Sequence, residues 1–362
     1  MSRDGRNFTS DNVTGVAPAI IEAILAANRG RVPSYGGDPI TQRLTALAAA
    51  VFETEVTIFP VATGTAANAL ALATLVPPYG SVIAYDMAHI VTDECGAPEF
   101  FSGGAKLLGL PAAHGTIRPE QLGPLFATAA AAGVHAAQPG AISLTQATEC
   151  GTLYSLAAIA EIAGVAKRHG LRMHMDGARL ANAIARLGCS PAEATWKAGI
   201  EVLSLGATKN GALAAEAVVF FDRDLARGFA ERRKRAGHLF SKQRFVSAQL
   251  EAYFTDGLWL ANAAHANGLA DRLAAGLAAL PGVSLTHAVE ANEIFAVLPD
   301  RMIDGLVADG FGFYRWPAEG GQGIRLVTAF DSDDEDVDAF LATAGRHAEA
   351  ASPGQGRARK AG

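Results

Sequence analysis

The sequence has few cysteines and no long hydrophobic run, and these two deficits exclude several classes of protein. Its three cysteines cannot form a disulfide framework and show no paired metal-ligand spacing. No stretch approaches the run of about 18 apolar residues that predicts a membrane span. The N-terminal residues are polar and lack the apolar stretch of a signal peptide. We therefore expect a reduced, cytoplasmic enzyme without a metal.

An excess of charge of one sign is also lacking. The chain has 30 Lys and Arg residues against 36 Asp and Glu residues, which gives a net charge of −6. This balance argues against a protein that binds nucleic acid or an anionic membrane. Half of the 362 residues are hydrophobic and only 18% are charged, which excludes a disordered chain. A folded chain of this length buries roughly 75% of its unfolded surface, enough to support a deep site.

Short apolar, β-branched runs alternate with Ala- and Leu-rich segments of helical length up to Asp222. Unbroken apolar strands, each followed by a helix, are typical of a mostly parallel sheet that helices cover on both faces. The sequence therefore predicts an α/β fold with a large, mostly parallel seven-stranded sheet. The predicted strands are Ile58–Val61, Val82–Tyr85, Ala105–Leu110, Ala141–Thr145, Arg172–Asp176, Glu201–Leu205 and Ala217–Phe221.

The pattern changes after Asp222, where a basic stretch is followed by a long helical segment. From Gly282 onward, short strands and two helices predict a smaller α+β unit of about 100 residues. We expect four parts along the chain. They are an N-terminal segment that contributes to the functional site (1–17), a large domain (18–248), a small α+β domain (249–347) and a disordered tail (348–362).

Two predicted strands end in residues that can carry chemistry. Lys209 stands among small residues just after one strand, and Asp176 ends the strand before it, 33 residues earlier. Ligands bind at the carboxyl ends of parallel strands, where desolvation makes a lysine a better nucleophile. A carboxylate beside such a lysine suits pyridoxal phosphate, because it keeps the pyridine nitrogen protonated. The alternatives are a solvated loop lysine and an aspartate that only caps the next helix.

Two further strand ends carry weaker signals. After the first predicted strand, Gly64 and Thr65 begin a helix, whose free N–H groups and partial positive charge suit a phosphate group. His89 follows the second strand at the same level, where an imidazole ring can stack on a cofactor or move protons. The alternatives are that Thr65 is only a helix cap and that His89 is structural.

Taken in order, these four stretches resemble the fold-type-I pyridoxal-phosphate enzymes. Among them, the sequence is similar to low-specificity L-threonine aldolases, particularly the branch that includes phenylserine aldolases. The likeness runs from about Phe8 to Phe330. Supporting stretches are Ser10–Thr14, Tyr35–Asp38, Asp93–Phe101 and Thr145–Thr152.

The resemblance implies a fold-type-I architecture with pyridoxal 5'-phosphate in the large domain. It implies that Lys209 carries the cofactor aldehyde, that Asp176 pairs with the pyridine nitrogen and that His89 stacks on the ring. The remaining implied contacts are Gly64, Thr65 and Thr208 at the phosphate, Arg179 near the cofactor, and Ser10, Arg179 and Arg325 at the substrate carboxylate. Arg325 is flanked by apolar strand residues, where an arginine either binds a carboxylate in bidentate fashion or faces water.

The catalytic base is less clearly indicated. The better-known aldolases often carry a second histidine at the end of the strand before the one that ends in Asp176. This sequence has no histidine there. His89 and His135 are therefore both candidate bases, and the alternative for His135 is an exposed loop residue. Asp93 either orients the base or caps a helix.

The resemblance also implies a homodimer or homotetramer with shared active sites. Lys242 and Arg244 match a segment that reaches the neighbouring subunit's phosphate in the family, with a solvated basic surface as the alternative. The predicted function is retro-aldol cleavage of L-threonine, L-allo-threonine or phenylserine to glycine and an aldehyde. The alternatives are a β-eliminating lyase, an aminotransferase on a small amino acid, and a cofactor-binding protein without turnover.

Overall fold

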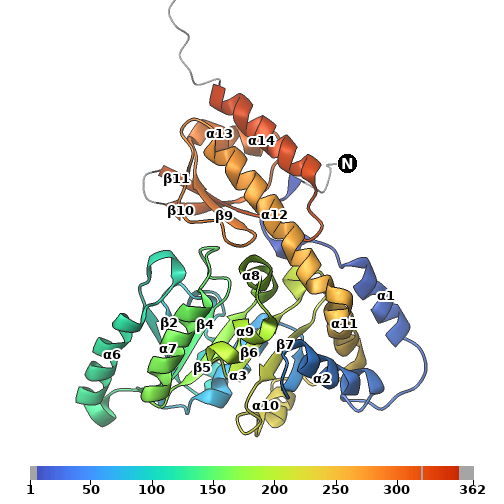
Figure 1. Ribbon diagram of the computed structural model, residues 1–362, viewed down its shortest axis with the longest axis vertical. Coiled ribbons are helices and arrows are strands. Elements are labelled where there is room, and N and C mark those ends of the chain that lie inside the picture. The colour runs from blue at the N-terminus through green and yellow to red at the C-terminus, as the bar shows by residue number, and fades with distance from the viewer. Residues whose placement is uncertain (1–5, 319–320, 350–362) are drawn as a thin grey trace, which may run out of the picture.

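The computed structural model describes residues 6–318 and 321–349 (Figure 1). The first five residues of the predicted N-terminal segment, and residues 350–362 of the predicted tail, lie outside the described residues. A large sheet flanked by helices forms the broad part of the molecule, and a smaller unit stands on it (Figure 1).

The large sheet has seven strands in the order β1-β7-β6-β5-β4-β2-β3. Six of the strands run parallel, and β7 is antiparallel to both of its neighbours, β1 and β6. All seven predicted strands are present. Their bounds are β1 Thr57–Val61, β2 Gly80–Tyr85, β3 Lys106–Leu110, β4 Gln138–Thr145, β5 Arg172–Gly177, β6 Val202–Gly206 and β7 Glu216–Phe220.

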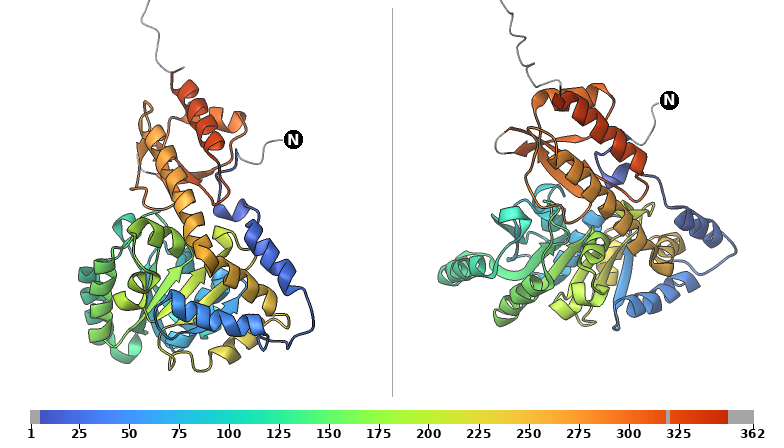
Figure 2. Two further views of the ribbon diagram at one scale, coloured as in Figure 1. Left: turned by 45° about the vertical axis from the view of Figure 1, so that its right-hand side comes forward. Right: turned by 45° about the horizontal axis from the view of Figure 1, so that its top comes forward.

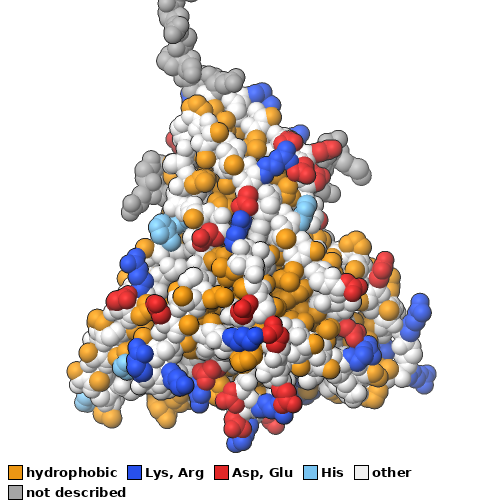
Figure 3. Space-filling view, viewed as in Figure 1, with side chains coloured by type: hydrophobic (Ala, Val, Ile, Leu, Met, Phe, Trp, Pro, Cys, Tyr) orange, Lys and Arg blue, Asp and Glu red, His pale blue; other side chains and the backbone are white. Residues whose placement is uncertain are grey.

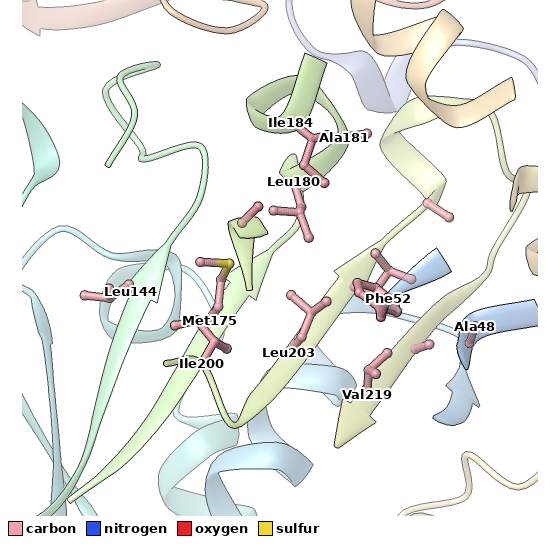
Figure 4. Packing of buried hydrophobic residues seen from close by; sticks show 14 of the residues in the cluster. Ala48, Phe52, Leu144, Met175, Leu180, Ala181, Ile184, Ile200, Leu203 and Val219 are labelled. Atoms are coloured by element: carbon pink, nitrogen blue, oxygen red, sulfur yellow. The ribbon is translucent and has the colours of Figure 1, made fainter. Parts of the chain in front are cut away.

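Side chains that alternate along the central strands build a separate core on each face of the sheet. Leu203 and Val219 pack with Phe52 on one face (Figure 4). Their neighbours Val202 and Val218 point to the opposite face. Because both faces are apolar, these strands read as continuous hydrophobic runs.

Helices cover both faces of the large sheet. The face with Val218 packs against α3 (Gly64–Leu75) and α10 (Phe229–Arg235). The opposite face packs against α2 (Pro39–Val51) and α8 (Leu180–Leu187). The other helices of this part are α1 Pro18–Ala27, α4 His89–Thr92, α5 Ala97–Ser102, α6 Pro119–Ala132, α7 Leu156–Arg168, α9 Pro191–Ala194 and α11 Arg244–Phe254.

The smaller unit has an antiparallel sheet in the order β10-β11-β9-β8, with three helices packed on it. The N-terminal residue Phe8 packs in its core beside Phe340. The elements are α12 Leu258–Ala278, β8 Ser284–Leu285, β9 Glu293–Val297, α13 Asp300–Ala308, β10 Tyr314–Ala318, β11 Gly321–Val327 and α14 Asp334–Glu349.

The long helix α12 joins the two units (Figure 2). Its first turns, with Trp259 and Ala263, pack in the core of the large sheet, whereas Leu269 and the residues after it pack in the core of the small sheet. The predicted boundary at 248/249 falls within α11, whose Leu250 lies in the core of the large sheet. The packing therefore changes from one core to the other within α12, later in the chain than the sequence predicts.

The visible face of the molecule carries positive and negative side chains interspersed (Figure 3). Among residues 6–318 and 321–349, no helix is long and apolar enough to cross a membrane.

Candidate active site

Most of the residues predicted to carry chemistry meet at one edge of the large sheet, where the parallel strands have their carboxyl ends. Asp176 lies at the end of β5, directly opposite Ser204 of β6. Lys209 follows β6 in a short 3-10 helix, η6 (Thr208–Asn210). His89 begins α4 just after β2, and Gly64 begins α3 just after β1.

Three neighbouring cavities of about 250, 70 and 710 Å³ open at this edge, and His89 and Lys209 line all three. Asp176 lines the first two, together with Lys209. The structure therefore brings the predicted lysine and aspartate into one pocket. The other predicted residues that line at least one of these cavities are Ser10, Gly64, Thr65, Asp93, Arg179, Thr208 and Arg325.

The carboxylate of Asp176 is held by two donors. Its Oδ1 atom accepts a hydrogen bond from the N–H of Ala178 at 3.0 Å, and its Oδ2 atom accepts one from the Asn68 side chain at 2.8 Å. Asn68 also donates to the buried Glu94 at 2.8 Å, and thereby joins the two carboxyl groups. The bonds fix the orientation of Asp176 at the cavity that contains Lys209.

Both ring nitrogens of His89 face carboxyl groups. Nδ1 lies 2.9 Å from Glu94 Oε1, and Nε2 lies 3.5 Å from Asp93 Oδ2. The hydrogen bond with Glu94, aided by the charges of Asp176 and Glu94, raises the pKa of His89 against the opposing effect of burial. The ring is therefore oriented and favoured in its protonated form.

Glu149 is a further carboxyl group at this edge of the sheet. Its Oε1 atom accepts hydrogen bonds from the N–H of His89 at 2.9 Å and from the Thr145 hydroxyl at 2.8 Å. Its Oε2 atom is buried and has no hydrogen-bond partner within the described part of the chain. Burial raises the pKa of Glu149 to about 7. We call Asn68, His89, Glu94, Glu149 and Asp176 the sheet-edge cluster.

The cavity of about 250 Å³ has a helix N-terminus in its wall. The Thr63 hydroxyl caps α3 by accepting from the N–H of Ala66, and the first turn of α3 has no acidic residue. A Cβ atom at Gly64 would meet nothing within 4 Å, so the space in front of this turn is open. Thr208 lines the same cavity. This end of the cavity is suited to an anion.

Glu216 also lines that cavity, from the antiparallel strand β7. Its carboxylate accepts a hydrogen bond from the N–H of Ala207 at 2.8 Å. Burial raises its pKa to about 7, although the bonds from Thr208 and the charge of Lys209 oppose this rise. A group that is half protonated near neutral pH repels a neighbouring anion less than a fixed carboxylate does.

Four charged residues lie where the large sheet, the small sheet and the N-terminal segment meet. Asp11 accepts two bonds from Arg179, at 2.8 and 3.0 Å, and Glu293 lies 3.2 Å from the same guanidinium. Glu293 also lies 3.9 Å from Arg325. We call Asp11, Arg179, Glu293 and Arg325 the interdomain cluster. It contains two positive and two negative groups, so its charges balance.

The two arginines of the interdomain cluster differ in whether all their guanidinium nitrogens have partners. All three nitrogens of Arg179 face carboxylates, which raise its pKa despite burial. Arg325 donates from Nη2 to the Thr9 carbonyl at 3.0 Å, and its Nε has no partner among the described residues. The rings of Tyr314 and Trp316 lie on it, each 5.2 Å from the guanidinium carbon. Arg325 is therefore the arginine that can accept a further anion.

Three predicted site residues lie elsewhere. His135 belongs to the 3-10 helix η4 (Gly133–His135), before the amino end of β4, and lines a separate hollow between β3 and α6. The eight residues of β4 separate it from the site, which is more than about 20 Å at 3.3 Å per residue. The prediction that His135 is a catalytic base is therefore wrong for this chain. Lys242 and Arg244 line none of the three cavities, and their contact with a neighbouring subunit stays a prediction.

Sequence reasoning assigned no role to five carboxyl groups of the site, Asp11, Glu94, Glu149, Glu216 and Glu293. Glu94 and Glu149 fall within two of the stretches that support the family resemblance, and both follow strand ends. Their position was thus a usable signal. Glu293 opens β9 in the small sheet, and nothing local in the sequence connects it with Arg179.

The strand order and the position of the site place the protein in the fold-type-I class of enzymes. Residues 7–300 match the profile of the family described as beta-eliminating lyase, and the chain belongs to that family. The predicted fold class and family relationship are confirmed.

The chain is similar to known aldolases over nearly its whole length. A low specificity L-threonine aldolase of Pseudomonas aeruginosa is 45% identical over 337 residues, which is 93% of this chain and 96% of the relative. A second, from a Pseudomonas species, is 42% identical over the same shares. The solved structure of a Leishmania major threonine aldolase superposes with a TM-score of 0.88 at 27% identity, over 94% of this chain and 98% of that one.

Proposed function

We propose that this protein is a pyridoxal-phosphate-dependent aldolase, a carbon–carbon lyase that cleaves L-β-hydroxy-α-amino acids into glycine and an aldehyde. The observation that carries the proposal is that Lys209 and Asp176, at the ends of the neighbouring parallel strands β6 and β5, line the same two cavities. The names of the Pseudomonas relatives support the choice of threonine-like substrates.

The residues around the pocket suit pyridoxal phosphate. The open first turn of α3 at Gly64 and Thr65, with Thr208 opposite, suits the phosphate group. Asp176 is oriented by Asn68 and suits a protonated pyridine nitrogen. The lone lysine of the pocket, Lys209, suits the aldehyde. When bound, the cofactor supplies an electron-accepting ring that takes up the electron pair of the breaking Cα–Cβ bond.

The residues of the chain position the substrate and its protons. Arg325 binds the substrate carboxylate with its free capacity, and Arg179 holds Asp11 and Glu293 in place beside it. Fixing the carboxylate sets which bond at Cα stands perpendicular to the ring, and so selects Cα–Cβ cleavage. Ser10 lines the same cavity as Arg325 and contributes a hydroxyl group to the carboxylate site.

The cavity of about 710 Å³ has room for more than the methyl group of threonine. Tyr85, Phe295, Tyr314 and Trp316 contribute aromatic side chains to its wall. Aromatic walls favour apolar and aromatic groups by burial and ring contacts. We therefore include phenylserine with L-threonine and L-allo-threonine among the substrates.

Purified protein with added pyridoxal phosphate and these three substrates tests the proposal. We expect equal amounts of aldehyde and glycine. Pyruvate with ammonia would instead identify a β-eliminating lyase, and conversion of the cofactor to its amine form would identify an aminotransferase. A bound yellow cofactor without turnover of any amino acid would leave a binding protein.

The predicted homodimer or homotetramer belongs to the same proposal. Lys242 is exposed in the single chain, whereas Arg244 is partly exposed and donates to the carbonyls of Arg29 and Gly30. Sedimentation of the wild type and of a Lys242→Ala variant measures the oligomeric state of each. Cofactor titration of both then tests whether Lys242 contributes to cofactor binding only in the assembled form.

A further inference from the structure

Glu149 has a buried carboxyl group in which one oxygen accepts two hydrogen bonds and the other accepts none from the described residues. Oε1 accepts two hydrogen bonds, from His89 N–H and from Thr145. Oε2 has neither a hydrogen-bond partner nor contact with solvent in the described structure. A carboxylate oxygen that is desolvated without a partner is costly, and a role in proton transfer is one reason for a protein to keep such a group.

Glu149 stands between the two ends of the site. The cavity of about 70 Å³ contains Asp176, and the cavity of about 710 Å³ contains Arg325. Glu149 lines both cavities, as do Lys209 and His89. A substrate that reaches from Lys209 to Arg325 would occupy the cavity of about 710 Å³, and Glu149 forms part of its wall.

Glu149 is better suited than His89 to accept a proton. Both nitrogens of His89 face carboxyl groups, and its raised pKa favours the protonated ring, which has no lone pair to offer. Burial, with a further contribution from Asp176, raises the pKa of Glu149 to about 7. A base with a pKa near the working pH is the most effective. The ionisable groups that share its two cavities are Tyr85, His89, Asp93, Glu94, His114, Cys150, Asp176, Arg179, Lys209, His287, Glu293, Tyr314 and Arg325.

We propose that Glu149 is a catalytic residue that accepts the proton of the substrate's β-hydroxyl group at its Oε2 atom. This inference rests on the proposed aldolase function. The O–H bond breaks as the Oε2–H bond forms, and the O–H electron pair becomes the second bond of the aldehyde C=O group. The Cα–Cβ bond breaks at the same time, and pyridoxal phosphate, when bound, would supply the acceptor for its electron pair. After the aldehyde leaves, Glu149 passes the proton into the vacated cavity, and Cα receives one proton to give glycine.

The Glu149→Gln variant separates proton transfer from structure. The glutamine Oε1 can still accept the bonds from His89 N–H and Thr145, but the amide cannot take a proton. We expect kcat for phenylserine cleavage to fall about 10²- to 10⁴-fold, the usual contribution of a general base. In the wild type, kcat/KM rises as the pH increases through about 7, because Glu149 must be ionised, and the variant loses this rise.

Glu201→Gln is the matched control. Glu201 also accepts from a backbone N–H, that of Met173, and from a side chain, that of Arg172, but at the amino end of β5. We expect its kcat to stay within about threefold of the wild type. A Glu149→Gln variant with kcat in the same range would overturn the proposal.

Exchange of the glycine α-proton in D₂O distinguishes a base from a structural residue. This exchange needs the cofactor, Lys209 and the carboxylate site, but no β-hydroxyl group. We expect Glu149→Gln to exchange glycine within about threefold of the wild type while it loses aldol cleavage. Equal losses in both reactions would mean that Glu149 only holds His89 and Thr145, and would overturn the proposal.

Two further results keep the outcome unambiguous. If Glu149→Gln does not fold or bind the cofactor, Glu149→Asp decides: it keeps a carboxylate, and we expect reduced cleavage that still rises with pH. A flat pH profile in that variant would overturn the assignment. If the wild type releases no aldehyde but still binds the cofactor and exchanges glycine, the aldolase function itself is wrong.

Discussion

The sheet-edge cluster and the interdomain cluster both line cavities with Lys209, but they differ in their balance of charge. In the interdomain cluster two arginines face two carboxylates, and Arg179 and Lys209 lower the pKa of Asp11 although burial acts to raise it. In the sheet-edge cluster, carboxyl groups outnumber cations. Burial there raises the pKa of Glu149, and also that of Glu94, where the bonds from His89 and Asn68 oppose it.

The difference separates two tasks within one site. Balanced ion pairs hold fixed charges, which suits the binding and orientation of a carboxylate. Carboxyl groups that are crowded and buried keep or exchange protons near neutral pH, which suits proton transfer. Variants in the sheet-edge cluster should therefore lower mainly kcat, whereas variants in the interdomain cluster should change mainly KM or stability.

The largest expected effect lies between the clusters, at Lys209. Lys209→Ala removes the amine that links the cofactor, so we expect complete loss of turnover and of the visible absorbance of the bound cofactor. Absorbance spectra and aldehyde release measure both. A variant with full aldolase activity would refute the assignment.

In the sheet-edge cluster, Asp176→Asn should reduce kcat without unfolding the protein. The amide keeps a similar shape beside Asn68 but does not hold the pyridine nitrogen protonated, and we expect kcat to fall about 10³-fold. Steady-state kinetics with saturating cofactor measure the fall. A change that appears only in KM would mean that Asp176 acts in binding, like the interdomain cluster.

In the interdomain cluster, the two arginines should differ from each other. Arg179→Ala leaves Asp11 and Glu293 buried without their main partner, so we expect the free energy of unfolding to fall by about 3–5 kcal/mol. Arg325→Ala leaves those pairs intact, and we expect a loss of only about 1 kcal/mol.

The kinetic effects of the two variants complete the comparison. Arg325→Ala should raise KM for phenylserine strongly while it lowers the free energy of unfolding only slightly. The reason is that it removes the free carboxylate-binding group. Urea denaturation and steady-state kinetics on both variants provide the test. Equal destabilisation by the two substitutions would contradict the division of roles between them.

The last expected effect is on the pH dependence of stability, and it comes from His174, which lies on β5 with Asp176. Its ring nitrogens lie 2.8 and 3.0 Å from the hydroxyls of Ser143 and Ser204, and burial lowers its pKa to about 4. The unfolded chain therefore binds a proton below pH 6.5 that the folded chain does not. Stability is lost as the pH falls from about 6.5 to 4, by up to about 3 kcal/mol.

Urea midpoints at pH 7.5 and pH 5 measure this effect. Glu149 and Glu216 act with the opposite sign, because their raised pKa values give the folded chain extra protons below pH 7. His174→Gln isolates the histidine, and we expect that variant to lose less stability on acidification than the wild type. The same pH dependence in both proteins would show that His174 is not neutral in the fold.

The position of each strand could be predicted from the sequence, but which strands pair with each other in the sheet could not. Central strands such as β6 and β7 are buried on both faces and read as short apolar runs, which made them recognisable. The pairing of β1 with β7, and the reversal of β7, depend on contacts between segments far apart in the chain. The strand ends nevertheless predicted the site, because parallel strands bring residues such as Asp176 and Lys209 to one edge.

The parts of the site that sequence reasoning missed depend on burial and on distant partners. Arg179 was expected at the substrate carboxylate, but Asp11 and Glu293 reach it from the N-terminal segment and from the small sheet. Glu149 lies in a stretch that supports the family resemblance, but the sequence does not show that its side chain is buried. Only the fold buries it and leaves one of its oxygens without a partner. His135 was proposed from its distance along the chain, which did not reveal that it lies at the opposite end of β4.

The most direct test of the account is to reduce the cofactor-loaded protein with borohydride and to locate the stable adduct by peptide mass spectrometry. The account predicts one phosphopyridoxyl group per chain, on Lys209. An adduct on a different lysine, or aldolase activity in a protein that forms no adduct, would contradict it.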